Sequence, residues 1–301
     1  MSTKRPGFPL PLQSVVKPAT PAARRPASPI GSGGQGAPAP RGPTPSPLRS
    51  AAPTPSPRPT PAVARTVDLP GTVARKVQKA APAPQGLGLD SGAVRARMVQ
   101  RLREQGVAHP AVLHALGLVE RHRFVDAALA GQAYDDNALP IGLGQTISKP
   151  SVVARMLALL LGDRAAPLGR VLEIGTGCGY QSALLSHLAQ EVYSIERLRG
   201  LHDKARENLR PLRLRNVHLM FGDGMLGYPS GAPYAGIVSA AGGAHLPSTW
   251  YEQLAMGGRL IAPTVTPAGH QALVLIEKTP QGPLQQVLEA VHFVPLKSGV
   301  E

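Results

Sequence analysis

Two features of the sequence have the residue types and spacing to bind a nucleoside. Gly175-Thr176-Gly177-Cys178-Gly179 is a glycine-rich turn between a β-rich run and a helical pattern. Glycines at such a place permit a tight turn and let a ligand approach the backbone. Glu196 ends the next predicted strand, 21 residues after Gly175. A carboxylate there can accept hydrogen bonds from both hydroxyls of a ribose. The order of strand, turn, helix, strand and Glu196 therefore predicts a nucleoside cofactor.

The details of the turn favour one kind of nucleoside. A nicotinamide fingerprint needs a third glycine at position 180, where Tyr180 stands. Gly-x-Gly-x-Gly preceded by the acidic Glu173 instead indicates S-adenosylmethionine, which has no pyrophosphate and carries a positive sulfonium. At the end of the third predicted strand, Asp223 can accept a hydrogen bond from an adenine amino group, and Gly224 leaves room for the ring. A plain Gly-Asp-Gly turn is the alternative for that last motif.

A third candidate group is the polar loop Gln145-Thr146-Ile147-Ser148, directly before Lys149-Pro150 and an apolar run. Proline suits the first position of a helix, and it pushes the residue before it out of helical geometry. Lys149 is therefore the predicted N-cap, and Ser148 lies just outside the helix with its hydroxyl free to face a ligand. The alternative is that these polar residues only close a turn.

The elements that must position these groups alternate between strand and helix from Arg170 onward. Strands are predicted at 171–175, 191–196, 216–224, 234–241, 259–265, 272–279 and 288–296. Helices are predicted at 181–190, 201–209 and 250–256. This order predicts an α/β fold with a doubly wound, mainly parallel sheet, in which the last two strands can form an antiparallel hairpin.

The region before the sheet is predicted to be mostly helical. Apolar residues recur at helical spacing in 93–105, after His109-Pro110, and from Pro150 to a stop at Gly162-Asp163. The stretch between the second and third of these helices, from Arg121 to Ser148, is polar and rich in turn residues, with little periodicity.

The composition divides the chain near Ser91. Residues 1–90 contain 20 of the 33 prolines and carry 12 Lys or Arg against two Asp. Such a segment cannot bury enough apolar surface to offset its ordering entropy, so we predict a disordered, basic, Pro-rich tail. The formal net charge of +14 lies mostly on this tail. Residues 91–301 have the length of one catalytic domain with a sizeable core.

The tail has several interpretations. The plainest is a solvated linker. Its charge also suits a tether for nucleic acid, an acidic protein or anionic lipid, although Phe8 is its only aromatic residue. The spacing of Pro55 to Pro61 weakly suits a partner that reads polyproline, and the density of prolines argues against an organelle transit peptide.

Several classes of site and location are disfavoured. Cys178 is the only cysteine, so an intrachain disulfide is excluded, which fits a reducing compartment. No apolar run is long enough to predict a membrane span, and the first residues lack the apolar core of a secretory signal. No histidine pair has metal-ligand spacing, so no metal is expected. We therefore expect a cytoplasmic protein.

A family resemblance covers residues from about 94 to 296. The stretches that carry it are RFV (123–125), AYDDNALPIGLGQTIS (133–148), VLEIGTGCGY (171–180), FGDG (221–224), PYAGIVSAAGGAHLP (233–247), GGRLIAP (257–263) and FVPL (293–296). In these stretches the chain resembles the protein-L-isoaspartate (D-aspartate) O-methyltransferases. The resemblance implies a Rossmann-like class I methyltransferase fold. It also implies methyl transfer from S-adenosylmethionine to the free α-carboxylate of isoaspartyl residues in damaged proteins and peptides.

Site residues carried over from the family follow the matching motifs. Ser148 matches the active-site serine. The positions that match cofactor binding or the adjoining loop are Gln145, Thr146, Ile147, Glu173, Gly175, Thr176, Gly177, Glu196, Asp223 and Gly224. The chain departs from the family pattern at Lys149, Ser151 and Ala235. It also ends soon after FVPL, so the resemblance predicts that a later C-terminal contact is missing.

Two other functions remain open at this stage. One is a methyltransferase acting on RNA or another substrate, with the basic tail as a binding arm. Base-amino methyltransferases usually have an Asn/Asp-Pro-Pro-aromatic motif after the fourth strand, where this chain has Ser-Ala-Ala-Gly-Gly (239–243). The other is a binding protein without catalysis, which the cofactor motifs and Ser148 disfavour.

A few further polar residues have ordinary interpretations beside functional ones. Arg121-His122-Arg123 can contact an anionic substrate, but a solvated helix end is commoner. Asp135-Asp136-Asn137 is better explained as a turn with a capping side chain than as a catalytic acid pair. His245 is expected to be a loop residue, and nothing in the sequence indicates that Cys178 is activated.

Overall fold

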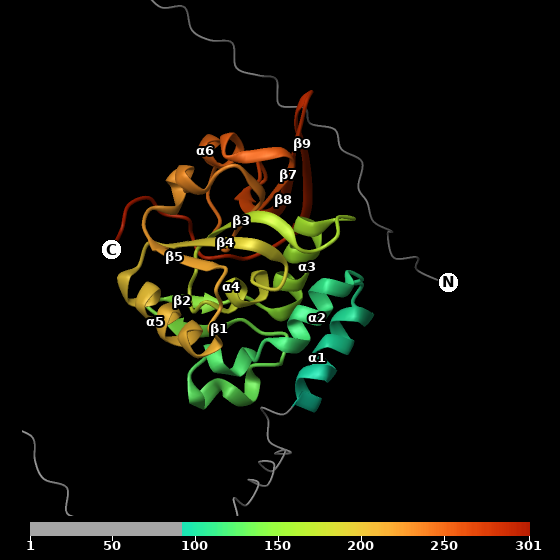
Figure 1. The fold of residues 1–301 in the computed structure, drawn as a ribbon, viewed down its shortest axis with the longest axis vertical. Helices are drawn as coiled ribbons and strands as arrows, with labels where there is room; N and C mark the ends of the chain where they lie inside the picture. Colours follow the sequence, from blue (N-terminus) through green and yellow to red (C-terminus); the bar gives the residue numbers. More distant parts are fainter. Residues whose placement is uncertain (1–91) are drawn as a thin grey trace, which may run out of the picture. The chain divides into compact units, whose positions relative to one another are not determined.

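The computed structural model describes residues 92–301. The predicted Pro-rich tail and its boundary near Ser91 lie outside the described residues. Figure 1 shows a central sheet with helices on its two faces. This is the predicted Rossmann-like α/β architecture.

The sheet has seven strands in the order β5-β4-β3-β6-β7-β8-β9. Their bounds are β3 Leu168–Ile174, β4 Ala189–Glu196, β5 Val217–Phe221, β6 Tyr234–Ser239, β7 Leu254–Val265, β8 Gln271–Thr279 and β9 Gly282–Ala290. The first five of these, β3 to β7, pair in parallel, whereas β8 and β9 are antiparallel to their neighbours. The strand order reverses beside β3, between β4 on one side and β6 on the other. Open α/β sheets bind ligands at the carboxyl ends of the strands at such a point.

Helices cover both faces of the sheet. Their bounds are α1 Gly92–Glu104, α2 Pro110–Leu118, α3 Pro150–Leu161, α4 Tyr180–Leu185, α5 Arg199–Leu209 and α6 Ser248–Glu252. In Figure 1, α6 lies above the sheet and the other helices lie below it. Among the described residues no helix combines the length and hydropathy that crossing a membrane requires.

Alternating side chains of the parallel strands build a core on each face. Val171 belongs to the apolar cluster shared with α1 to α5, and Leu172 belongs to the cluster around Trp250 on the α6 side. Successive residues of a strand point to opposite faces, so a strand covered on both faces reads as a continuous apolar run. Trp250 is fully buried and donates its indole N–H to the Gly224 carbonyl at 2.8 Å.

Shorter elements connect the helices to the sheet. The first hairpin pairs β1 Leu139–Gly142 with β2 Gln145–Ile147, in the stretch that the sequence pattern presented only as turns. Single-turn helices are η1 Arg121–Phe124, η2 Ala127–Gln132, η3 Arg210–Leu212, η4 Gly224–Leu226 and η5 Pro229–Gly231.

Several element boundaries differ from those predicted. The helix after the glycine turn ends at Leu185 rather than at residue 190, because Ala189 already pairs with Leu168 in the sheet. The helix containing Trp250 ends at Glu252, and Leu254 begins β7. The last strand is Gly282–Ala290 rather than 288–296, and the residues after it run back beside Gly242.

Candidate functional site

The glycine turn joins β3 to α4 at the switch point of the sheet. Gly175, Gly177 and Gly179 all have positive φ, at 86°, 57° and 90°, a region that other residues rarely adopt. The Thr176 side chain faces down from this turn, where its hydroxyl lies 2.6 Å from that of Ser194, and it is only 4% exposed. The backbone of the turn is therefore the part open to a ligand, while Thr176 supports it from below.

Glu173 lies under the turn and is fully buried. Its Oε2 accepts hydrogen bonds from the hydroxyls of Ser194, at 2.6 Å, and of Ser182 in α4. Its Oε1 has no hydrogen-bond partner within the described residues. Burial raises the pKa of the Glu173 carboxyl from 4.5 to about 7, and the two serine hydroxyls oppose this rise. Glu173 thus presents a buried oxygen without a donor beneath the predicted cofactor site.

Glu196 connects the end of β4 to the glycine turn. Its Oε2 accepts the Gly177 N–H and its Oε1 accepts the Leu198 N–H, both at 2.9 Å. Two backbone donors therefore fix the direction of the carboxylate. Each oxygen can accept a second hydrogen bond, so the carboxylate retains acceptor capacity for a ligand, and its role toward ribose hydroxyls stays a prediction.

Asp223 ends the next strand on the same edge of the sheet. Its Oδ1 accepts the Met225 N–H at 2.8 Å, and its Oδ2 accepts the Gly299 N–H at 2.6 Å. Gly224 is needed for packing, since a Cβ there would lie 2.6 Å from Ile174 Cγ2. The space at Gly224 is thus already filled by the core beneath it.

The five residues after Leu296 cross the edge formed by β4 and β5, a contact that the sequence did not lead us to expect. We call residues 297–301 the C-terminal strap. The Arg197 guanidinium donates to the Gly299 carbonyl and to the Glu301 side chain, both at 3.1 Å. Backbone bonds join Glu301 N–H to the Arg197 carbonyl and Arg199 N–H to the Glu301 carbonyl, both at 2.8 Å. In Figure 1 the chain's C-terminus accordingly lies on the β5 side of the sheet.

The predicted loop over the site is the β1–β2 hairpin and the residues that follow it. Ile147 points into the core and is 5% exposed, whereas Thr146 is exposed and Gln145 and Ser148 are partly exposed. The Ser148 carbonyl accepts a hydrogen bond from Arg121 at 2.8 Å. The Ser148 hydroxyl forms no hydrogen bond within residues 92–301, so this hydroxyl is free to bind a substrate. Lys149 is the N-cap of α3, as Pro150 predicted.

Thr146 and Ser148 line a hollow of about 410 Å³ together with the loop after β6 and the segment after β9. Its residues are Ala138, Thr146, Ser148, Lys149, Val152, Ala240, Ala290, Val291, His292, Phe293 and Val294. Ala240 also touches the glycine turn, since a Cβ at Gly175 would lie 3.5 Å from the Ala240 Cβ. The hollow beside Ser148 and the turn therefore share a wall. Apart from Thr146 and Ser148, the predicted site residues do not line this hollow; these are Gln145, Ile147, Glu173, Gly175, Thr176, Gly177, Glu196, Asp223 and Gly224.

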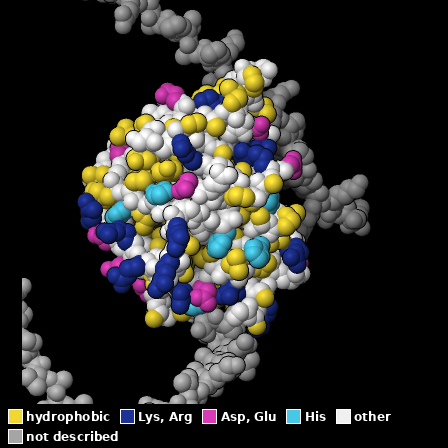
Figure 2. Space-filling view, in the orientation of Figure 1, with side chains coloured by type: hydrophobic (Ala, Val, Ile, Leu, Met, Phe, Trp, Pro, Cys, Tyr) yellow, Lys and Arg dark blue, Asp and Glu magenta, His cyan; other side chains and the backbone are white. Residues whose placement is uncertain are grey.

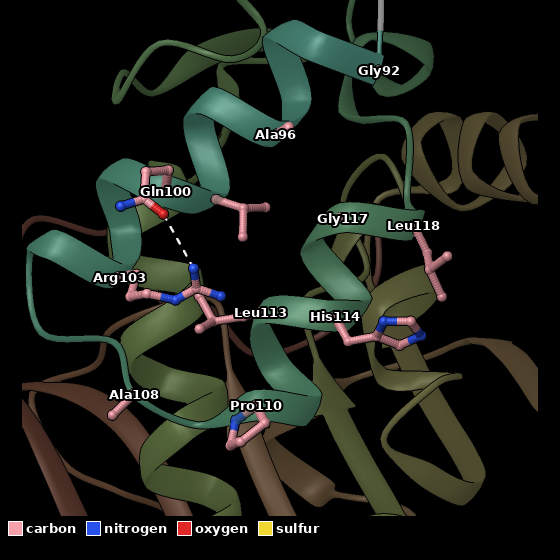
Figure 3. Close-up of a pocket in the computed structure, with 11 residues that line it drawn as sticks. Gly92, Ala96, Gln100, Arg103, Ala108, Pro110, Leu113, His114, Gly117 and Leu118 are labelled. Carbon is pink, nitrogen blue, oxygen red and sulfur yellow. Dashed lines mark hydrogen bonds between the residues drawn. The ribbon is translucent and has the colours of Figure 1, made fainter.

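Two larger hollows contain none of the predicted site residues. One, of about 710 Å³, lies between α1 and α2, and Figure 3 shows Leu113 and Pro110 beside it. The other, of about 730 Å³, is lined by Arg206, Arg210 and Arg213 of the α5 region, where basic side chains gather in Figure 2. Of these three hollows of the described residues, the smallest is the one that adjoins the glycine turn and is lined by Ser148, so it is the candidate site for the chemistry.

The structure also places the other polar residues for which the sequence offered both an ordinary and a functional interpretation. Arg121 is fully buried rather than solvated at a helix end. Asp136 caps α3, because both the N–H and the hydroxyl of Ser151 donate to it, at 2.8 and 2.7 Å. His245 is an exposed loop residue. Burial raises the pKa of the Cys178 thiol to about 11, so the thiol is not activated.

A model of one protein family matches residues 93–301, which is most of the chain. The chain belongs to the protein-L-isoaspartate(D-aspartate) O-methyltransferase family. The site described above therefore belongs to a methyltransferase of this family. Within the described part of the chain, no group of three His, Cys, Asp or Glu side chains is arranged to hold a metal ion.

Individual relatives agree with the family model. The methyltransferase is 57% identical over 221 residues to a protein-L-isoaspartate O-methyltransferase of Methylibium petroleiphilum, a match that covers 72% of this chain and 82% of that protein. It is also 57% identical over 217 residues to one of Leptothrix cholodnii, covering 71% and 77%.

Solved structures share the fold. One, of a protein-L-isoaspartate O-methyltransferase, is 27% identical with a TM-score of 0.61, and the match covers 68% of this chain and 67% of that one. A protein from Plasmodium falciparum, crystallised with S-adenosyl-L-homocysteine, is 22% identical with a TM-score of 0.58, and the match covers 67% and 98%.

Proposed function

We propose that this enzyme repairs damaged proteins by moving a methyl group from S-adenosylmethionine to the free α-carboxylate of L-isoaspartyl and D-aspartyl residues. One observation carries the assignment of the site. Ser148, whose hydroxyl forms no hydrogen bond within residues 92–301, lines a hollow that shares Ala240 with the glycine turn. An acceptor held at Ser148 and a donor held at the turn are then neighbours.

The residues of the turn fit S-adenosylmethionine. Glu173 Oε1 has no donor within the described residues and lies fully buried under the turn, where the carboxyl group suits the nearby positive charge of the cofactor without touching it. Glu196 suits the ribose hydroxyls, and Asp223 suits the adenine amino group. Gly175 and Gly177 leave the backbone open to close approach. When bound, the cofactor supplies a methyl group on a positively charged sulfur, which the carboxylate oxygen of the substrate accepts.

The acceptor needs positioning more than activation. A carboxyl group has an ordinary pKa of about 4, so it is ionised at neutral pH without a general base. The Ser148 hydroxyl can donate a hydrogen bond to it without adding charge, next to the positive N-terminal end of α3. Ser148 and the walls of the hollow then align the carboxylate and exclude water.

Repair follows from the product. Methanol leaves from an ester far more readily than oxide leaves from a carboxylate. The backbone nitrogen of the adjoining amide can therefore attack the ester carbonyl without the enzyme, which closes the succinimide ring and releases methanol. Hydrolysis of the succinimide returns part of the material to normal aspartate. The enzyme therefore has to provide only the methyl transfer.

Tritiated S-adenosylmethionine offered to three acceptors tests this function. These are an isoaspartyl peptide, the same peptide with normal aspartate, and tRNA. We expect base-labile label on the isoaspartyl peptide alone. Base-stable label on the tRNA, with none on either peptide, would instead establish the RNA methyltransferase that the sequence left open, which the family relationship does not favour.

Two earlier expectations stay predictions. The cytoplasmic location rests on the single cysteine and on a sequence without an apolar run long enough for a membrane span or the apolar core of a secretory signal. A nucleic acid or acidic protein as the partner of the basic tail concerns residues that lie outside the described part of the chain.

A further inference from the structure

Arg121, in η1, is a buried cation whose hydrogen bonds within residues 92–301 go to backbone carbonyls. It is 0% exposed. Its Nε donates to the Ala133 carbonyl at 2.8 Å, and its Nη2 donates to the carbonyls of Ser148 at 2.8 Å and of Asn137 at 3.3 Å. Within residues 92–301 no carboxylate forms an ion pair with it.

Burying the Arg121 charge without an ion-pair partner costs folding free energy, which is unexpected for a side chain that only fills space. Burial lowers the pKa of the Arg121 guanidinium, which reflects the cost of taking the charge out of water. Its Nη1 has no hydrogen-bond partner among the described residues. Well-packed apolar side chains often replace buried charges without loss of stability. What an apolar side chain cannot supply is a rigid set of donors with fixed directions.

The donors of Arg121 bind the backbone that positions the Ser148 hydroxyl. Asn137 and Ser148 lie just before and just after the β1–β2 hairpin, so one nitrogen, Nη2, closes the base of that hairpin. The bond to the Ser148 carbonyl fixes the backbone from which the Ser148 hydroxyl projects. The guanidinium also lies 4.9 Å from the ring centre of Tyr180, the first residue of α4 after the glycine turn.

We propose that Arg121 is a positioning residue for methyl transfer. It fixes the backbone of Ser148 relative to the glycine turn, and thereby aligns the acceptor carboxylate with the methyl donor. This inference rests on the proposed function, since it gives Arg121 a role only through the hydroxyl of Ser148. A displacement of about 1 Å at a reacting pair is enough to slow a reaction about a hundredfold.

Kinetics of Arg121→Met and Arg121→Lys test the role. Methionine removes both the donors and the buried charge, and lysine keeps the charge without the planar set of donors. We expect kcat on the isoaspartyl peptide to fall about tenfold to a hundredfold, with the KM for S-adenosylmethionine within about twofold of wild type. The matched control is Arg101→Met, because the Arg101 guanidinium donates to the Tyr134 carbonyl at 2.6 Å but makes no bond to the Ser148 segment. Its kcat should be unchanged.

A double mutant separates positioning from general loss of structure. If Arg121 acts through Ser148, then Arg121→Met combined with Ser148→Ala loses no more kcat than the larger single loss. Multiplied losses, or full activity in either folded Arg121 variant, would overturn the inference. Should both Arg121 variants fail to fold while Arg101→Met folds, Arg121 is a stability residue and the inference also fails.

Hydrogen exchange supplies a readout that needs no reaction. Amides at 145–148 should exchange faster in Arg121→Met than in wild type or Arg101→Met, and equal exchange would count against the inference. Absence of label on the isoaspartyl peptide with wild-type enzyme would contradict the proposed function instead, so the two failures can be told apart.

Discussion

Replacing Glu173 with glutamine should make the stability of the protein less dependent on pH. In the folded chain, burial raises the pKa of this carboxyl from 4.5 to about 7. A rise of this size corresponds to about 3 kcal/mol of unfolding free energy, at about 1.4 kcal/mol for each pH unit. Because the pKa is higher in the folded chain, the stability contribution is fully present below pH 4.5 and is lost as the pH rises through about 7.

Glutamine keeps the size of the side chain and one oxygen acceptor for the hydroxyls of Ser182 and Ser194, but it cannot ionise. The wild type should therefore lose stability relative to Glu173→Gln by up to about 3 kcal/mol between pH 4.5 and pH 8. Taking the difference between the two proteins cancels the groups that titrate in both of them.

Urea unfolding at several pH values measures this difference. Trp250 is the only tryptophan and is fully buried, so its fluorescence reports loss of the core. Far-ultraviolet circular dichroism checks that unfolding is two-state. If the difference in unfolding free energy between wild type and variant does not change with pH, the Glu173 carboxyl is already ionised throughout the range, and the reasoning from burial is wrong.

Three further predictions concern the site. Ser148→Ala should lower kcat about tenfold to a hundredfold and leave cofactor binding unchanged, since a hydrogen bond to a charged group is worth about 1.5–3 kcal/mol; steady-state kinetics with full activity would refute its role. Glu196→Gln should weaken S-adenosylmethionine binding at least about tenfold, as measured by calorimetry. The single amide oxygen of glutamine cannot accept both the Gly177 and the Leu198 N–H, and an unpaired buried donor costs about 1–3 kcal/mol. Cys178 should resist iodoacetamide at neutral pH in the folded protein and react only on unfolding, as followed by mass spectrometry, since its pKa of about 11 leaves little thiolate.

The sheet could be predicted because its signals are local. Each parallel strand is a short apolar run, and the positive-φ glycines after β3 mark the turn. Glu196 and Asp223 could be placed on one edge because carboxyl ends of parallel strands meet there. Family resemblance, rather than periodicity, singled out Ser148.

The remaining features depend on contacts between distant segments. The β1–β2 hairpin has strands of four and three residues, with Pro140 and Gly142 in the first, so its alternation of buried and exposed residues is too short to be recognised as a strand. Strand β9 is an edge strand with Leu284 and Val287 half exposed, and its polar sequence misled the prediction toward the apolar residues beyond it. Arg121 looked solvated because its carbonyl partners lie up to 27 residues away.

The two hydrogen bonds that the Asp223 carboxylate accepts have a consequence for the ageing of the enzyme itself. Asp223 is followed by Gly224, and an Asp-Gly pair is the sequence in which the next backbone nitrogen attacks the side chain with least obstruction. A repair enzyme for isoaspartate thus carries a pair prone to isoaspartate at the edge of the sheet where its cofactor is proposed to bind. The N–H groups of Met225 and Gly299 hold both carboxylate oxygens, and both bonds must break before the side chain can turn toward Gly224. Through the Gly299 N–H, the C-terminal strap therefore also hinders, in this enzyme, the damage that the enzyme repairs in other proteins.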